Sequence, residues 1–420
     1  MTHDRFLRSI ACPSGIPADV RIIVDEQLQL WTDFEILSSM FSVFESCFGN
    51  TFGSHLLKSL KLTKEKGCYR DNTYYEDGSL WQKVTKFINT ANVNPDEASK
   101  CLAYVQFFFG EAERYVMRDN ARRCWRKKRI VLDIPNTVLC LDASADYQPV
   151  TLDGFTIVRL KEQASLSFHN HVIHVISGNP TATHTSRTWD GFRQIVTNGV
   201  NALHAPSIFI AMSKSDKNKT LNDKVDELAK DFRAKGYEVK TGNRGADTRG
   251  SNQFADCDTG VIAMPLFTTI ADYALEAAVV DGKDVPSGDI WCKGQDGRLH
   301  PRMHKGFVAE RLNRAFSRRY ADEFVQTVLR TKMRRHDGNC CHIWGQLPSF
   351  STLVHIHKAL PGIRFEGNDP TVKTWNLLES LTKTQLLDIS LNDILKQTGI
   401  AKNKDTLKET EKALWCYLMK

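Results

Sequence analysis

Short apolar segments that alternate with helical patterns restrict the fold of this chain more than any other feature of its sequence. Segments with strand character occur at 20–24, 137–141, 155–160, 171–176, 207–212 and 260–264. A helical pattern at 219–235 ends before Gly236, a typical helix C-cap, and a further strand begins at Tyr237. Strands and helices that alternate at this spacing predict an α/β fold built on a mostly parallel sheet.

The stretch between the first two apolar segments has a different pattern. From 33 to 129 the apolar residues approximate a helical period, and Pro95 marks the start of a long helix expected to run through Arg126. This stretch therefore predicts a helical insert. Its end, 118–129, carries seven lysine and arginine residues around Trp125. Such a run can bind single-stranded nucleic acid, and a solvated helix end explains it equally well.

Composition and length exclude several classes of protein. The 420 residues are 41% hydrophobic and 25% charged, which excludes a disordered chain, a collagen-like chain and a coiled-coil rod, and the length suggests two or three domains. No apolar run could span a bilayer, and the first residues lack a signal-peptide core. We therefore expect a cytoplasmic protein with no membrane partner. The net charge of +7 is compatible with nucleic acid, and the eleven cysteines are expected to be free thiols.

The first candidate site follows the strand at 20–24. Asp25 and Glu26 end this apolar segment, and the carboxyl ends of parallel strands are where ligands bind. In a nucleotide hydrolase, the first carboxylate holds magnesium and the second orients and deprotonates the attacking water. Taken alone, the pair is explained more simply by a strand end followed by an acidic helix cap.

Two loops of small and polar residues are further candidates. Asp142 and Ser144 follow the apolar segment 137–141, and Ser144 could relay hydrogen bonds. In 248–256, with the sequence TRGSNQFAD, a glycine stands beside Arg249, so that backbone and side-chain donors could bind phosphates. Each loop, taken alone, also fits an ordinary polar turn.

A fourth candidate lies in the basic helical segment at 300–335. Gln326, Arg330 and Arg334 are four residues apart, so they are predicted to share one face of a helix. Two arginines on one face could meet a γ-phosphate and the charge that develops on it during transfer. An exposed basic helix face is the common alternative.

The order of these segments resembles that of the ATP-dependent nucleic-acid helicases and translocases with two RecA-like domains, nearest to superfamily 2. IIVDEQ resembles the Walker B motif, and VLCLDASAD resembles the motif that couples ATP hydrolysis to strand movement. IFIAMSKS resembles the first strand of the second RecA-like domain. RGSNQFADCD resembles the motif that contacts both nucleotide and DNA, and QTVLRTKMRR resembles the arginine-finger motif. The resemblance covers approximately residues 17–350.

The resemblance implies a role for each matching residue. Asp25 would bind Mg²⁺ and Glu26 would activate water, while Arg330 or Arg334 would be the arginine finger. The residues implied in binding ATP are Asp25, Gln27, Asp142, Arg249, Gly250, Asp256 and Gln326. The residues expected to contact nucleic acid are Ser144, Ser213, Ser251 and Asn252, together with Trp125 and Arg126 of the basic run.

Two departures from the family pattern affect this interpretation. The chain contains no G-x-x-x-x-G-K-[ST] phosphate loop, which in this family precedes the Walker B strand. The resemblance therefore implies the C-terminal part of a helicase, with ATP hydrolysis weak or absent unless a preceding segment or a separate chain supplies the loop. In the arginine motif, the spacing is one residue longer than in the family and Leu329 replaces a glycine, so Arg330 and Arg334 remain alternatives.

These patterns predict four regions. They are a partial first RecA-like domain at 1–32 and 130–160, a helical insert at 33–129, a complete second RecA-like domain at 161–350, and a helical tail at 351–420 with a helix-turn-helix rhythm. The implied function is that of an ATP-dependent helicase or translocase acting on single-stranded or forked DNA in replication or repair. The alternatives are a helicase-derived nucleic-acid-binding or regulatory protein without ATPase activity, and a different nucleotide-binding α/β enzyme.

Two groups of histidine and cysteine residues do not suggest a metal site. Cys340 and Cys341 lie between His336 and His342, which is too tight a spacing for a metal-binding motif. The other group, in a strand-like segment, is His169, His171 and His174. Core or surface positions in a strand explain these three residues.

Overall fold

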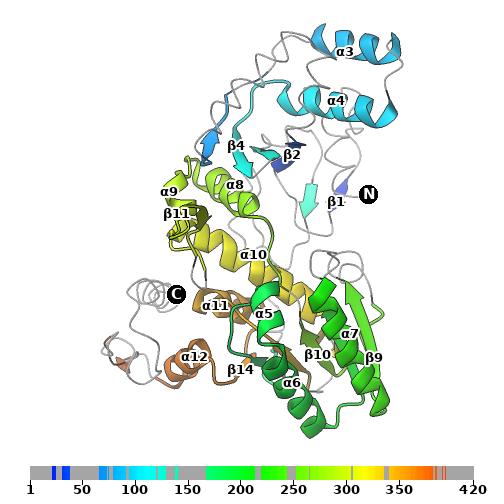
Figure 1. Ribbon diagram of the computed structural model, residues 1–420, viewed down its shortest axis with the longest axis vertical. Coiled ribbons are helices and arrows are strands. Elements are labelled where there is room, and N and C mark those ends of the chain that lie inside the picture. The colour runs from blue at the N-terminus through cyan, green and yellow to red at the C-terminus, as the bar shows by residue number, and fades with distance from the viewer. Residues whose placement is uncertain are drawn as a thin grey trace. The chain divides into compact units, whose positions relative to one another are not determined.

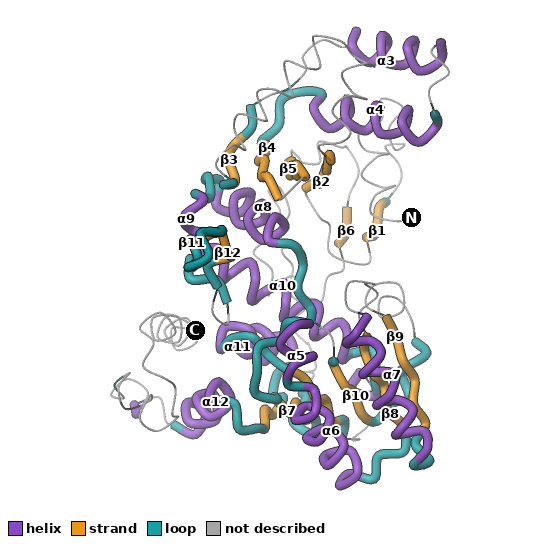
Figure 2. The backbone as a smooth tube through the Cα atoms, viewed as in Figure 1, coloured by secondary structure: helices purple, strands orange, loops and turns teal. Residues whose placement is uncertain are grey.

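The computed structural model of the chain (Figures 1 and 2) describes residues 21–24, 31–37, 66–72, 74, 79–90, 94–119, 122–128, 138–140, 167–212, 219–243, 252–263, 265–303, 306–334, 340–381, 384–385, 390 and 393. The chain forms two compact units. Unit 1 consists of Met1–Arg159 and Thr268–Arg302, and unit 2 consists of Leu160–Phe267 and Met303–Lys420. Unit 1 thus takes one segment from within the sequence of unit 2.

A six-stranded parallel sheet forms the centre of unit 2, with the order β14-β7-β13-β10-β8-β9. Its strands are β7 (Val172–Val175), β8 (Ser207–Met212), β9 (Glu238–Asn243), β10 (Thr259–Ile262), β13 (His342–Gly345) and β14 (Arg364–Glu366). The central strands β8 and β10 are almost entirely buried, because a parallel sheet is covered on both faces. This burial explains their continuous apolar sequences, and the predicted α/β fold class is confirmed.

Helices lie between these strands in the sequence, and one helix follows the last strand. They are α5 (Ala182–Arg187), α6 (Trp189–Leu203), α7 (Lys219–Ala234), α10 (Glu310–Val328), α11 (Phe350–Ala359) and α12 (Pro370–Ser380). In the main core cluster, apolar side chains of α6 and α7, such as Val196 and Phe232, pack against those of the sheet, such as Ile210 and Trp344. Gly236 follows α7 with φ +89°, so a residue free to adopt positive φ ends this helix as predicted.

The parallel sheet continues beyond residue 350, where the second domain was expected to end. The strand β14 pairs with β7 in parallel and forms one edge of the sheet. The helix α11 lies between β13 and β14 in the sequence, and α12 follows β14 directly. Residues 351–381 therefore belong to the α/β fold of unit 2. Most of the predicted helix-turn-helix that follows lies outside the described residues.

Unit 1 contains an antiparallel sheet within the predicted helical insert. Its order is β2-β5-β4-β3, with β2 (Trp31–Leu37), β5 (Arg122–Lys128), β4 (Arg114–Asp119) and β3 (Cys68–Arg70). Two helices, α3 (Ser79–Thr90) and α4 (Pro95–Phe108), accompany it. Helices thus make up only part of the insert.

The prediction that the helix from Pro95 runs through Arg126 is wrong, because α4 ends at Phe108. Gly110 adopts φ +70°, which turns the chain, and the side chain of Arg114 then folds back over the helix end. Its buried guanidinium donates hydrogen bonds to backbone carbonyls in the last turn of α4 and the turn that follows it, namely those of Phe107, Phe109, Gly110 and Ala112. A cation that satisfies terminal carbonyls stabilises a helix end.

The segment that unit 1 takes from the second half of the chain completes its core. It comprises α8 (Ile270–Asp281), α9 (Ser287–Ile290), β11 (Trp291–Lys293) and β12 (Leu299–Pro301). The helix α8 packs on β3, β4 and β5. Cys68 and Val285 exchange backbone hydrogen bonds of 2.9 and 2.8 Å, which tie this segment to the edge strand β3.

Candidate functional site

The two strands that precede the first predicted motifs lie side by side in unit 1. The strand β1 (Ile22–Val24) pairs in parallel with β6 (Val138–Cys140), and Val24 lies opposite Cys140. Because the pair is parallel, both strands end at the same edge. Asp25 and Asp142 are therefore the first and second residues after two adjacent strand ends.

Many of the predicted site residues themselves lie outside the described residues. These are Asp25, Glu26, Gln27, Asp142, Ser144, Ser213, Arg249, Gly250 and Ser251. In the part of the chain that the structure describes, no group of three or more side chains could hold a metal ion. The magnesium site at Asp25 stays a prediction.

In unit 2, the structure brings together two predicted motifs that are far apart in the sequence. Arg334 Nη1 donates a hydrogen bond of 3.1 Å to Asn252 Oδ1, across 82 residues of sequence. A second contact joins the same two segments: Lys332 Nζ lies 2.5 Å from Asp258 Oδ1. The backbone N–H of Lys332 also donates a hydrogen bond to the carbonyl of Cys257. The loop 252–258 and the segment 330–334 thus form one site, which we call the Asn252–Arg334 site.

Buried anchors hold the loop 252–258 in place. The ring of Phe254 is buried and stacks on Phe209 of β8, with 4.2 Å between ring centroids. Cys257 is also buried, and burial raises the pKa of its thiol to about 11. At the end of the loop, Asp258 Oδ2 accepts a 2.8 Å hydrogen bond from Ser207 Oγ. These anchors leave Asn252 and Asp256 exposed on the same loop.

The arginine segment does not continue the helix before it. The helix α10 ends at Val328, and a separate 3₁₀ helix covers Lys332–Arg334, so the prediction that Gln326, Arg330 and Arg334 share one helix face is wrong. Between the two helices, Thr331 Oγ1 donates a 2.6 Å hydrogen bond back to the carbonyl of Val328. Such a side-chain bond offers the backbone an alternative to continuing the helix.

The three side chains therefore have different surroundings. Gln326 is half-buried and donates to the carboxylate of Asp322, one helical turn earlier. Arg330 is also half-buried. Arg334 is exposed, while the neighbouring Met333 is fully buried and anchors the 3₁₀ helix. Of the two candidate arginine fingers, Arg334 is the more accessible.

The Asn252–Arg334 site lies at the amino edge of the parallel sheet. Its two segments lead into β10 and β13, which begin at Thr259 and His342 and run in the same direction. Ligands of a parallel sheet usually bind outside the opposite, carboxyl edge. An arginine finger, however, acts on a phosphate that other parts of the protein or a partner hold. A guanidinium beside a neutral amide can supply the donors and the positive charge for that contact.

Trp125 is not a platform for stacking on a base, so that prediction is wrong. Its side chain is fully buried, and its Nε1–H donates a 2.8 Å hydrogen bond to the buried carboxylate of Asp71. Its ring packs against Phe34 of β2 and Phe108 of α4. The reason is that β5 is a central strand of the antiparallel sheet, so the basic run is not a solvated helix end.

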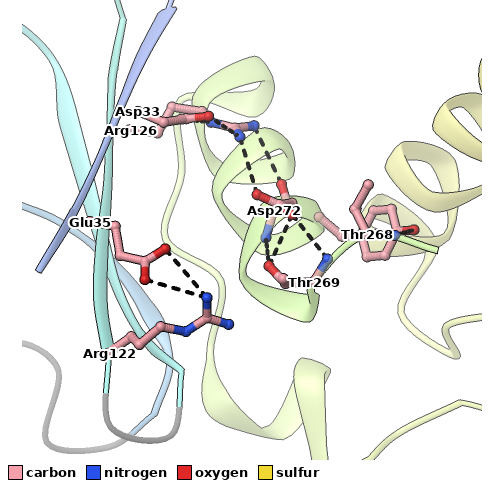
Figure 3. Close-up of polar contacts among 8 residues, drawn as sticks. Asp33, Glu35, Arg122, Arg126, Thr268, Thr269 and Asp272 are labelled. Atoms are coloured by element: carbon pink, nitrogen blue, oxygen red, sulfur yellow. Dashed lines mark hydrogen bonds and ion pairs between the residues drawn. The ribbon is translucent and has the colours of Figure 1, made fainter. Parts of the chain in front are cut away.

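The side chain of Arg126 likewise binds partners within unit 1, so the prediction that it contacts nucleic acid is wrong. Its fully buried guanidinium forms a bidentate ion pair with Asp33 of β2, with 2.6 Å from Nε to Oδ1 and 3.0 Å from Nη2 to Oδ2 (Figure 3). It also donates to the backbone carbonyl of Asp272, whose carboxylate forms the capping box of α8 with Thr269. Arg126 therefore joins the sheet to the amino end of α8.

The sequence reasoning missed three residues that build the Asn252–Arg334 site. Lys332, Asp258 and Ser207 connect the arginine segment, the loop and the start of β8. The alternation of cationic residues at 330, 332 and 334 is a signal that could have drawn attention to Lys332. No local pattern marks Ser207, because its role depends on the neighbouring position of β10.

Comparisons with known proteins add little to this description. No protein-family model matches the chain. No curated protein matches it either. Among solved structures, a chain named XPD helicase is similar with a TM-score of 0.37 and 12% sequence identity, over 84% of this chain and 69% of that chain. Among the described helices, none combines the length and the apolar character needed to cross a membrane.

Proposed function

We propose that this chain is part of an ATP-dependent DNA helicase or translocase. The observation that carries the proposal is the hydrogen bond between Arg334 and Asn252. It joins two segments that the sequence resemblance assigns to the arginine-finger motif and to the motif that contacts nucleotide and DNA. The parallel pairing of β1 with β6 supports the proposal in the same way, because these strands precede the other two motifs.

The charges of the Asn252–Arg334 site favour Arg334 as the arginine finger. Lys332 is neutralised by its ion pair with Asp258, whereas the described partner of Arg334 is a neutral amide. The site therefore presents a guanidinium whose charge is not compensated by that partner. In the proposed reaction, Arg334 stabilises the charge that develops on the γ-phosphate, and Asn252 orients it.

The remaining roles follow the sequence resemblance. Asp25 would hold magnesium and Glu26 would activate the attacking water, while Asp142 and Ser144 would couple hydrolysis to movement on DNA. The nucleotide itself needs a phosphate loop, which the 420 residues do not contain. We propose that a preceding segment or a separate chain supplies it.

The test is ATP hydrolysis stimulated by single-stranded DNA. It compares this chain with a longer protein that includes the sequence encoded upstream, each with Glu26→Gln and Arg334→Ala. We expect hydrolysis in the longer protein, its loss in Glu26→Gln, and a fall of about 10³-fold or more in Arg334→Ala. Arg187→Ala is a matched control, because Arg187 is an exposed arginine of unit 2 on α5.

Two outcomes would contradict the proposal. If Arg334→Ala hydrolyses ATP as fast as Arg187→Ala, the Asn252–Arg334 site does not contain the arginine finger. If both protein lengths are inactive but bind single-stranded DNA in a salt-dependent way, the chain is instead a nucleic-acid-binding module without ATPase activity.

A further inference from the structure

A stack of three aromatic rings lies on one face of the parallel sheet in unit 2. His174 of β7 stacks on Trp344 of β13, with 4.5 Å between centroids and 14° between the ring planes. His174 also stacks on His342 of β13, at 5.1 Å and 12°. In the parallel register, His174 lies opposite Trp344 and next to Glu366 of the edge strand β14. The buried Trp344 therefore fixes the two imidazole rings against each other.

Polar contacts through these rings connect an exposed thiol to a carboxylate. Cys340 Sγ lies 3.1 Å from His342 Nε2, and His342 Nδ1 lies 2.8 Å from His174 Nε2. His174 Nδ1 in turn lies 3.6 Å from Glu366 Oε2, which is an electrostatic contact rather than a direct hydrogen bond. A nucleophile within hydrogen-bond reach of a base that a third group orients is the geometry of nucleophilic sites.

The nearby carboxylate favours one arrangement of the ring hydrogens. Because a carboxylate only accepts, that arrangement places the hydrogen of His174 on Nδ1, which faces Glu366 at 3.6 Å. His174 Nε2 is then an acceptor, so His342 Nδ1 must donate to it. His342 Nε2 is left as an acceptor, and the thiol of Cys340 donates to it.

The surroundings keep both imidazoles neutral and the sulfur protonated. Burial lowers the pKa of His174 to about 4, and burial also lowers the pKa of His342. Partial burial raises the pKa of the Cys340 thiol, an effect that Arg364 opposes and Glu366 reinforces. Near neutral pH, the sulfur is therefore a thiol beside a neutral imidazole, and it needs a proton acceptor in order to react.

We propose that Cys340 is a modification site for low-molecular-weight disulfides, with His342 as its base and with His174 and Glu366 as positioning residues. In the reaction, the thiol proton moves to His342 Nε2 while Sγ attacks one sulfur of the disulfide. The disulfide bond breaks as the Cys340 mixed disulfide forms, and the departing thiolate takes the proton from His342. The protein sulfur is oxidised, and the released sulfur is reduced.

A metal ion fits this cluster less well than a covalent modification does. The two nitrogen atoms of His342 face different neighbours, with Cys340 at Nε2 and His174 at Nδ1. The thiol and His174 therefore cannot both join His342 around one ion. This agrees with the finding that no group of three metal-ligand side chains occurs among the described residues.

The test uses dithionitrobenzoate, an aromatic disulfide, on the whole chain, and follows each cysteine by peptide mass spectrometry. Cys292 is the internal control, because it is an exposed thiol whose sulfur contacts a backbone carbonyl at 3.6 Å. Burial raises the pKa of the Cys340 thiol, so without a base Cys340 should react more slowly than Cys292 near neutral pH. With His342 as its base, we expect Cys340 to react at least as fast as Cys292, and a Cys340 rate roughly tenfold or more below that of Cys292 would overturn the proposal.

Variants of His342 and Glu366 then test whether these residues, and not the exposure of the thiol alone, determine the rate at Cys340. In His342→Gln, the Cys340 rate should fall by roughly tenfold near neutral pH and approach the wild-type rate at alkaline pH, where the thiolate forms without a base. The Cys292 rate in the same sample reports whether the variant is folded normally. Glu366→Gln, at a side chain that is 51% exposed, should fold and slow Cys340 by a smaller factor. An unchanged Cys340 rate in both variants would overturn the assignment of His342 as the base.

Discussion

Arg126 and Arg334 both lie in basic runs of the sequence, and the two units of the molecule use them in opposite ways. In unit 1, the guanidinium of Arg126 is fully buried and paired with Asp33. In unit 2, Arg334 is exposed on a 3₁₀ helix and bonds to the neutral amide of Asn252. A basic run therefore does not reveal the role of its members, because that role depends on the element that carries each residue.

The partners of the two arginines explain this difference. A charge taken out of water costs several kcal/mol unless a counter-charge and hydrogen bonds replace the lost hydration. Arg126 meets this need with two carboxylates and a backbone carbonyl. Arg334 remains in water and needs no counter-charge, so its positive charge is available to a phosphate.

The largest expected effect concerns the core of unit 1. Trp125→Ala should lower the free energy of unfolding by about 3–5 kcal/mol, because it empties a large buried site and leaves Asp71 without its indole donor. Urea unfolding would measure it. Trp125→Phe keeps most of the ring and should cost less, about 1–3 kcal/mol. If Trp125→Ala is as stable as the wild type but binds single-stranded DNA weakly, Trp125 is a contact residue after all.

Arg126→Ala should have the next largest effect on stability. We expect a loss of about 2 kcal/mol, below the 3–5 kcal/mol typical of broken buried pairs, because Asp33 is 56% exposed and can regain water. The same urea experiment measures it. Arg122→Ala is the matched control on β5, because its pair with Glu35 is partly exposed and should contribute no more than about 1 kcal/mol (Figure 3). If the two variants lose the same unfolding free energy, the ion pair of Arg126 is no more stabilising than the exposed pair of Arg122.

A third prediction concerns the acid sensitivity of unit 2. Burial lowers the pKa of His174 from 6.5 to about 4, so the unfolded chain binds a proton that the folded unit 2 does not. Stability from this group is complete above pH 6.5 and is lost as the pH falls towards 4. The loss should be about 2 kcal/mol between about pH 7 and about pH 5.

Urea unfolding at the two pH values measures this loss, and His174→Gln is the control variant. The variant should remove the His174 contribution of about 2 kcal/mol, whereas the contributions of His342 and His357, whose pKa values burial also lowers, should remain. If His174→Gln is as acid-sensitive as the wild type, other groups cause the effect.

The smallest expected effect on stability is that of Arg334→Ala. Because this side chain is exposed, the unfolding free energy should change by no more than about 0.5 kcal/mol. Because the proposed function places Arg334 at the γ-phosphate of ATP, its loss should leave the slope of log K against log salt concentration for single-stranded DNA unchanged, whereas a DNA phosphate contact would lower that slope by about 0.7. Fluorescence anisotropy at several salt concentrations measures the slope, with Arg187→Ala as the control. A large loss of stability would mean that Arg334 is a structural residue like Arg126.

Sequence reasoning succeeded where local pattern and burial agree. The strands β8 and β10 are buried on both faces, so their apolar runs were visible without any knowledge of their neighbours. The helix α7 was recognised from its period and from Gly236 at its end. Sequence reasoning failed for β4 and β5, because side chains on both faces of β5 are buried and no simple alternation of apolar and polar residues marks this strand. It also missed the end of α4, which depends on carbonyl contacts made by Arg114 after the turn.

Local patterns in the sequence were enough to predict the α/β class and the strands that precede the candidate motifs, because hydrophobic period and turn residues act over a few neighbouring positions. The surroundings of Trp125, Arg126, Asn252 and Arg334, by contrast, follow from the folded structure alone. Whether an arginine is buried against a carboxylate or left in water depends on elements far away in the chain. For Arg126, α8 arrives from the second half of the sequence, and for Arg334, the parallel sheet brings in a loop 82 residues distant. Long-range packing of this kind leaves no local pattern.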